Sequence, residues 1–281
     1  YIELAERAMN ELKRSREEAF YLALKAVLVS PDFLYLKETG DENGKLTSWE
    51  MANRLSYFLW SSMPDGQLFG LAQQGELVKP EVVRQQVFRM LEDPRSAAFV
   101  EGFATSWLRL DKLGSMPADS LKFQEYYLHG LEDSMKAETL AFVENAVKAN
   151  APLTDFLDSD YTFVNQDLAR HYGIEDVDGI HFRYVSLPAE SPRGGLLGQA
   201  SILTLSANGI DTSPVVRGIW VLENLMGTPP PPPPPDVEPL DPDVRGATTI
   251  RQRLAKHSEI ESCADCHAKI DPFGFPLEYF D

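Results

Sequence analysis

Cysteine is nearly absent from this 281-residue sequence, which contains only two. A secreted fold held together by several disulfides is therefore excluded. Long apolar runs are missing as well, since no stretch approaches the roughly 20 apolar residues that span a bilayer. The longest candidate, residues 20–28, is interrupted by Lys25 and predicts a buried helix face instead.

Basic residues are also scarce. The chain has 26 Lys and Arg against 43 Asp and Glu, a formal net charge of −17. This balance argues against nucleic acid as a partner, because phosphate backbones require clustered basic side chains. An acidic surface suits a basic docking partner, although it serves solubility equally well. Arg193-Gly194-Gly195 is too short for a glycine-rich phosphate loop.

Helical periodicity dominates the sequence as far as Tyr172. The segment to Leu36 is periodic, and Thr47 or Ser48 is the expected N-cap of a helix that ends near Ser61. Short helices joined by turns are expected over residues 152–172. Longer helices are predicted over residues 66–74, 80–91, 95–107 and 131–149.

The pattern changes after Gly173. Residues 181–187 alternate and predict a short strand, and small and aliphatic residues predict a helix over 196–205. The next helix is expected to have Ser213 as its N-cap and Pro214 in its first turn. Its predicted buried face consists of Val215, Ile219, Leu222 and Met226.

Seven consecutive prolines, Pro229 to Pro235, follow this helix. Such a run adopts polyproline II at about 3.1 Å per residue and spans on the order of 22 Å. A stiff spacer is the favoured interpretation. The alternatives are a strap that holds the last segment against the preceding helices, or a ligand for an aromatic groove.

The two cysteines lie in Cys263-Ala264-Asp265-Cys266-His267, which is the attachment signature of c-type haem. Two thiols one turn apart reach the two vinyl groups of the porphyrin and form thioethers. The histidine that follows is then placed to ligate the iron, whose potential depends on its axial ligands. The sequence therefore predicts one covalent haem c, with His267 as the metal ligand.

Three other interpretations compete with haem. A redox Cys-x-x-Cys normally follows a strand in a βαβ pattern, which is missing from the predicted elements. Zinc would need four ligands, and Cys263, Cys266, His267 and His257 can supply them, although adjacent Cys266 and His267 are awkward around one small ion. Two buried, inert thiols are the third interpretation. Haem is favoured over all three.

Two further residues are candidates for cofactor binding. His257 shares one face of a short predicted helix with Ile250 and Leu254 and is directed inward, towards the haem or towards a hydrogen-bonded place in the core. Arg217 can pair with a haem propionate, and a surface or helix-capping role is an equal alternative. Arg193 has the same two options.

The ligand on the opposite side of the iron is not evident, because no methionine follows His267. The candidates are Met116, Met226, His181 and His257, and a vacant position is a further possibility. A saturated iron favours electron relay, whereas a vacant position favours peroxide or oxygen chemistry.

Several motifs together resemble the planctomycete-type multi-domain cytochrome c proteins, large bacterial proteins assembled from domains of unknown function. The resemblance is carried by Arg193 to Leu197, Thr212 to Gly218, Gly227-Thr228 with the proline run, and Cys263 to Asp281. Upstream it extends over Ser30 to Tyr35, Arg54 to Asp65, Asp160 to Asn165 and Leu168 to Gly173, and so over nearly the whole chain.

This resemblance implies an exported, periplasmic or otherwise extracytoplasmic c-type cytochrome, with haem attached to Cys263 and Cys266 and ligated by His267. The expected fold is mainly α, a multi-helix N-terminal domain followed by a small α-helical cytochrome c-like haem segment with a polyproline strap. The expected division is 1–45, a helical segment; 46–172, a helical domain of unknown function; and 173–281, a C-terminally truncated haem-binding domain.

The predicted function is electron transfer to a redox partner protein or a neighbouring cytochrome domain. Whether the chain is itself an enzyme stays open. A haem enzyme, such as a peroxidase or the electron-accepting subunit of a dehydrogenase, is the first alternative. The second alternative makes the helical first 170 residues or so a binding module that tethers the haem unit, which an exposed apolar patch would favour.

Overall fold

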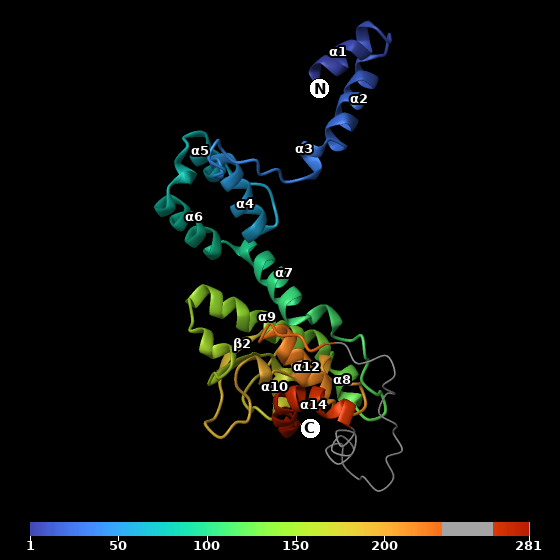
Figure 1. Cartoon of the computed structure of the whole chain (residues 1–281), viewed down its shortest axis with the longest axis vertical. Coiled ribbons are helices and arrows are strands. Elements are labelled where there is room, and N and C mark those ends of the chain that lie inside the picture. The colour runs from blue at the N-terminus through green and yellow to red at the C-terminus, as the bar shows by residue number, and fades with distance from the viewer. Residues whose placement is uncertain (232–260, 281) are drawn as a thin grey trace. The chain divides into compact units, whose positions relative to one another are not determined.

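The computed structural model describes residues 1–231 and 264–280 with their side chains, and the backbone of residues 261–263. The expected mainly α fold is confirmed (Figure 1). Among the described residues, no helix combines the length and apolarity that a membrane span requires. Pro229 to Pro231 adopt neither helix nor strand, and the other four prolines lie outside the described residues.

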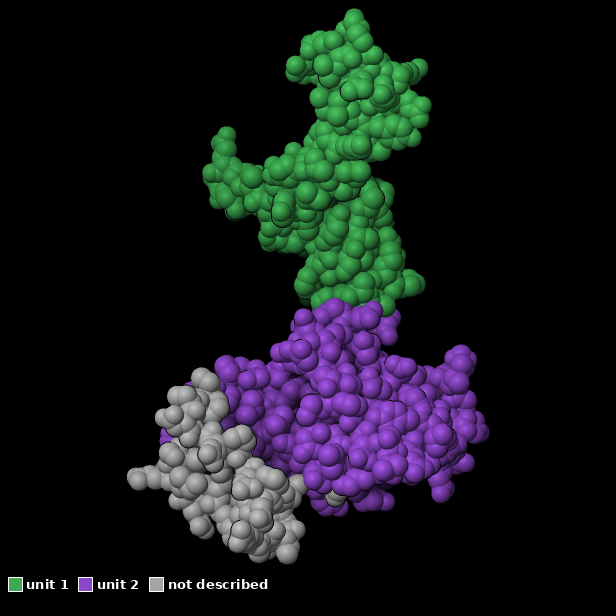
Figure 2. Space-filling view, turned by 90° about the vertical axis from the view of Figure 1, so that its right-hand side faces the viewer, with its two compact units in different colours: residues 1–99 green, residues 100–281 purple. Residues whose placement is uncertain are grey.

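The chain forms two compact units, Tyr1–Phe99 and Val100–Asp281, coloured separately in Figure 2. The boundary lies early in helix α7 (Ala97–Leu108). The expected division at residues 45 and 172 stays a prediction.

The first unit consists of helices and short 3-10 turns. Thr47 rather than Ser48 is the N-cap of α4, and it forms a reciprocal capping box with Glu50. Pro80 occupies the first turn of its helix, as predicted. The elements are α1 (Ile2–Asn10), α2 (Arg16–Leu28), α3 (Pro31–Leu34), α4 (Ser48–Trp60), α5 (Gly66–Gln73), η1 (Glu76–Val78), α6 (Pro80–Glu92) and η2 (Pro94–Ser96).

Trp60 organises the core of this unit. Its ring packs with Leu59, Leu68 and Leu77, and its indole N–H donates to the carbonyl of Met90 at 3.0 Å. The guanidinium of Arg95 lies over the same ring, 3.4 Å from its centre. One aromatic side chain thus joins α4 to α6 through apolar and hydrogen-bonding contacts, and to η2 through a cation–π contact.

The second unit contains the remaining elements. After α7 they are η3 (Leu110–Lys112), α8 (Gln124–Leu128), α9 (Leu131–Ala149), η4 (Leu153–Phe156), β1 (Tyr161–Val164), α10 (Gln166–Tyr172), β2 (Arg183–Ser186), η5 (Leu196–Gly198), α11 (Ala200–Leu205), α12 (Pro214–Asn224), α14 (Glu261–Gly274) and η6 (Phe275–Phe280). Its core is built around α9 and α10, with Met135, Val164 and Leu168 at its centre.

Strand β2 confirms the alternating pattern near residues 181–187, but its partner was missed. Residues 161–164 were expected within a series of short helices, whereas they form β1, which pairs antiparallel with β2 from Tyr161↔Ser186 to Val164↔Arg183. Tyr161, Thr162 and Val164 are all buried, so no alternation marks the strand in the sequence. Only the pairing partner some twenty residues later identifies it.

The predicted buried face of α12 is confirmed at Leu222, which is buried, and is wrong at its other three positions. Val215 and Ile219 are only partly buried and Met226, beyond the end of the helix, is exposed, whereas Arg217, Gly218 and Val221 are buried. The reason is the partner: α12 packs against α14 through the side that carries Gly218. Ser213 precedes Pro214 as predicted, but its side chain makes no capping hydrogen bond.

Candidate functional site

The Cys-x-x-Cys-His motif lies on α14, which crosses α12 at very short range. A Cβ atom at Gly218 would be 2.4 Å from the carbonyl oxygen of Ile270, and one at Gly274 would be 1.8 Å from that of Pro214. Neither position has room for a side chain, so the two glycines let the helix backbones touch. This crossing holds α14, and with it the motif, against α12 within the second unit.

His267 is the best-positioned side chain of the motif. It is 12% exposed, and its Nδ1 atom lies 3.0 Å from Oδ1 of Asp271, one turn further along α14. A carboxylate can only accept from the ring, so this contact favours the tautomer with the proton on Nδ1. In that tautomer the lone pair is on Nε2, the atom that a metal would use.

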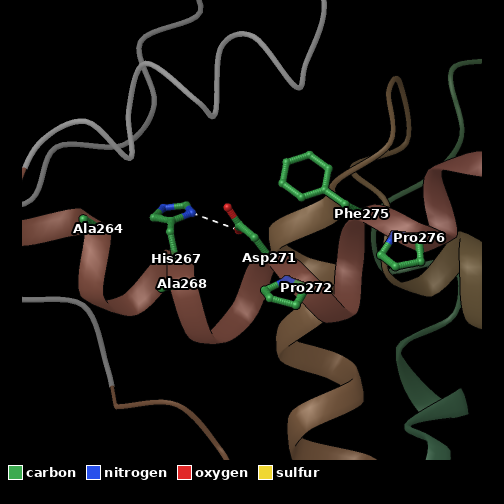
Figure 3. A pocket seen from close by; sticks show the side chains of 7 residues that line it. All are labelled: Ala264, His267, Ala268, Asp271, Pro272, Phe275 and Pro276. Carbon is green, nitrogen blue, oxygen red and sulfur yellow. Dashed lines mark hydrogen bonds and ion pairs between the residues drawn. The ribbon is translucent and has the colours of Figure 1, made fainter.

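An open groove of about 580 Å³ lies along the same face of α14 (Figure 3). His267 and Asp271 point into it together, and Phe275 follows one turn later. Ala264 and Ala268 also line it. The small side chains leave space beside the imidazole, and the proline and phenylalanine rings supply apolar surface.

The backbone of α14 places residues 263 and 266 about one helical turn apart. Cys266 is half-buried and forms no disulfide. The side chain of Cys263 lies outside the described residues, as does all of His257. The structure therefore brings Cys266 and His267 onto one helix beside the groove, while the predicted role of His257 stays a prediction.

Arg217 is buried rather than exposed, so the alternative of a surface arginine is wrong. Only 2% of its side chain is accessible, and its Nη1 atom donates to the carbonyl of Leu277 and to Oε1 of Glu278, both at 3.1 Å. These bonds tie α12 to η6. Arg217 does not line the groove beside His267, and its pairing with a propionate stays a prediction.

Three of the four candidates for a ligand opposite His267 do not line this groove, and the fourth, His257, lies outside the described residues. Met116, Met226 and His181 are all exposed, and the described lining of the groove contains none of them. The sixth position of an iron held by His267 is thus not assigned to any described side chain.

A buried polar cluster around Glu138 was not predicted from the sequence. Glu138 is 1% exposed and accepts hydrogen bonds from Thr162 and Tyr172, both at 2.5 Å. Burial raises the pKa of this carboxyl to about 7 despite both donors, and the pKa of Tyr172 rises well above its usual value. The phenol oxygen of Tyr172 also accepts from the backbone N–H of Ala200 at 2.8 Å.

The only sequence signal for this cluster is the position of Glu138, one turn after the buried Met135 on α9. Arg193 lies over the ring of Tyr172 at 3.8 Å and completes the cluster. The Arg193-Gly194-Gly195 motif is therefore part of the packing around a buried carboxyl.

Zinc is the alternative metal for this motif, and only part of its conceivable ligand set belongs to the described side chains. Among them, no three His, Cys, Asp or Glu residues converge as a metal site would require. However, two of the four conceivable ligands, Cys263 and His257, lie outside that set. The donor set on α14, two thiols followed by an imidazole with a carboxylate behind it, fits covalent haem.

Comparison with known proteins gives two family matches. Residues 46–174 match PSD4, described as a protein of unknown function (DUF1592), and residues 193–281 match PSCyt3, described as a protein of unknown function (DUF1588). At a coarse level both fit the planctomycete-type cytochrome c proteins, and the second name is cytochrome-related. No curated protein and no solved structure matches the chain.

Proposed function

We propose that the chain is a c-type cytochrome that binds one covalent haem and transfers electrons in an extracytoplasmic redox chain. The observation that carries this proposal is the motif on α14, where His267 faces an open groove and is oriented by Asp271. The cytochrome-related name of the family that matches residues 193–281 supports it.

Each residue of the motif has a separate task. The thiols of Cys263 and Cys266 would hold the haem through thioethers to its vinyl groups, and Nε2 of His267 would ligate the iron. When bound, haem supplies one-electron chemistry at a potential set by its surroundings. Because the attachment is covalent, a groove as open as this one is sufficient to retain the cofactor.

Asp271 is a positioning residue in this scheme. By accepting the Nδ1 proton it fixes the orientation of the imidazole and increases the basicity of Nε2. A more basic ligand stabilises the oxidised metal more than the reduced metal, so Asp271 lowers the reduction potential. The net charge of −17 suits a basic redox partner.

The decisive experiment is the absorption spectrum of the protein purified from a host that matures c-type cytochromes. The expected result is a reduced α band of c type, and colour that stays with the protein after extraction with acidified acetone. A double variant, Cys263→Ser with Cys266→Ser, should lose the colour to the solvent. A colourless wild-type protein, or one that contains zinc, would overturn the proposal.

The spin state of the iron in the same sample tests the electron-transfer role. A low-spin spectrum with both axial positions filled is expected for a relay. High-spin iron that turns over peroxide would instead indicate a haem enzyme. The variant His267→Ala should keep the thioether-bound haem while losing the wild-type spectrum, which separates attachment from ligation.

A further inference from the structure

A second cavity, apart from the groove on α14, lies inside the second unit. Its volume is about 640 Å³, within the range of roughly 300–1,000 Å³ that is usual for small-molecule sites. It lies between α8, α9 and α11, and the loop after α11 together with Phe280 borders it. Among the described residues, His267, Asp271 and Cys266 are not part of its lining.

Most of the cavity wall is apolar. Tyr126 and Leu131 come from the buried core around α9, and Leu203 comes from α11. Phe123 and Phe280 add two aromatic rings. A wall of this kind removes water from an apolar molecule, and each apolar Å² buried contributes about 25 cal/mol.

The charged side chains in the wall are nearly all paired. Lys122 lies 3.5 Å from Asp211, and Arg217 lies 3.1 Å from Glu278. Glu125 lies 2.8 Å from the ring of His129. These pairs leave little net charge to attract a ligand.

Arg193 is the exception among the charged residues of the wall. Within the described part of the chain, no carboxylate oxygen lies within 4.0 Å of its guanidinium, and its one side-chain hydrogen bond runs from Nη1 to the carbonyl of Gly198 at 2.6 Å. The rings of Tyr172 and Phe280 lie 3.8 Å and 5.4 Å from the guanidinium carbon. Aromatic contacts on this group hold it in place without using its remaining N–H donors.

Glu138 is a buried acid whose carboxyl interacts electrostatically with Arg193, and it does not neutralise the guanidinium fully. Its pKa of about 7 keeps a large fraction protonated at neutral pH. His171 also lines the cavity, and burial together with Arg193 lowers the pKa of its imidazole, so this ring is neutral there.

We propose that this cavity binds an apolar carboxylate, with the carboxylate on Arg193 and the hydrocarbon part between Tyr126, Leu203 and Phe280. An arginine fork that still has free donors matches a carboxylate. The apolar wall adds affinity that a small anion such as acetate cannot obtain.

Isothermal titration of the haem-loaded protein with decanoate, 1-decanol and acetate tests the proposal. Decanoate should bind at a single saturable site, at least tenfold more tightly than 1-decanol, and acetate should give no saturable heat. Arg193→Gln should weaken decanoate at least tenfold and change 1-decanol less than twofold. Arg95→Gln is the matched control, because that guanidinium also stacks on an aromatic ring but lies in the first unit.

A second variant covers the case in which Arg193→Gln does not fold. Ala207 is half-buried in the cavity wall outside the helices, so Ala207→Trp fills the cavity and should weaken both decanoate and 1-decanol at least tenfold. The proposal is overturned if decanoate gives no saturable heat. It is equally overturned if acetate binds as tightly as decanoate, or if decanoate binding is unchanged in Ala207→Trp.

Discussion

The buried carboxyl of Glu138 should make the stability of the second unit depend on pH near neutrality. Its side chain is 1% exposed in the middle of α9, and burial is the largest cause that raises its pKa from 4.5 to about 7. The hydrogen bonds from Thr162 and Tyr172 and the charge of Arg193 oppose this shift without cancelling it.

The direction of this pH dependence follows from the state, folded or unfolded, in which the Glu138 carboxyl binds its proton more tightly. The folded state holds the Glu138 proton up to about pH 7, whereas the unfolded chain releases it near pH 4.5. The stabilisation by this proton is complete below pH 4.5 and is lost as the pH rises through 7. At about 1.4 kcal/mol per pKa unit, the free energy of unfolding falls by about 2–3 kcal/mol between pH 5 and pH 8.

The assay is urea unfolding at pH 5, 6, 7 and 8, followed by hydrogen exchange in peptides from α9, which reports on the second unit alone. Glu138→Gln removes the titrating proton and keeps a side chain of the same shape. Between pH 5 and pH 8 the wild type should therefore lose about 2–3 kcal/mol of unfolding free energy relative to Glu138→Gln.

Glu144→Gln is the control, since Glu144 lies on the same helix, is partly exposed and pairs with Lys148 at 2.6 Å. Glu144→Gln removes the same formal charge as Glu138→Gln, but from a carboxyl that is not fully buried. Parallel pH profiles for wild type and Glu138→Gln would refute the reasoning, as would an equal effect of Glu144→Gln.

Three further predictions concern the motif helix and the helix caps. In the haem-loaded protein, Asp271→Asn should raise the reduction potential by tens of mV in a redox titration. For scale, 59 mV corresponds to a tenfold change in the one-electron equilibrium constant. The control Asp265→Asn makes an equal charge change on an exposed residue of α14 and should have a clearly smaller effect. Gly218→Ala should lower the unfolding free energy by about 1–3 kcal/mol in urea, because its Cβ would meet the carbonyl of Ile270 at 2.4 Å; unchanged stability would contradict the close crossing. Thr47→Ala should cost about 1 kcal/mol by the same measurement through loss of the cap of α4, and Thr47→Ser should restore it.

The candidate site was predictable from the sequence to the extent that its signals are local. Cys263, Cys266 and His267 stand within five residues, so their spacing alone specifies what they can reach together. The role of Asp271 was not predicted, although a carboxylate four residues after a histidine is its neighbour on a helix. That inference requires the motif to lie within one continuous helix, and the local pattern of residues around it does not establish this.

The misassigned parts of the fold share one physical cause. Strand β1 is buried on both sides and pairs with a segment some twenty residues away, so no alternation of its own reveals it. The buried face of α12 is decided by α14, which follows after more than thirty residues. In both cases the packing partner, and not the local pattern, selects the conformation or the face.

The sequence by itself determined that the chain is mainly helical, where the long helices lie, and that Cys263, Cys266 and His267 have the spacing on which the proposed haem attachment rests. Those features depend on neighbours three or four positions away, which periodicity and capping rules can detect. Only the tertiary structure decided that Gly218 and Gly274 bring α14 against α12, that Glu138 is buried, and that Arg193 faces a second cavity. Burial and pairing depend on which distant segments meet, and distances along the chain do not encode that.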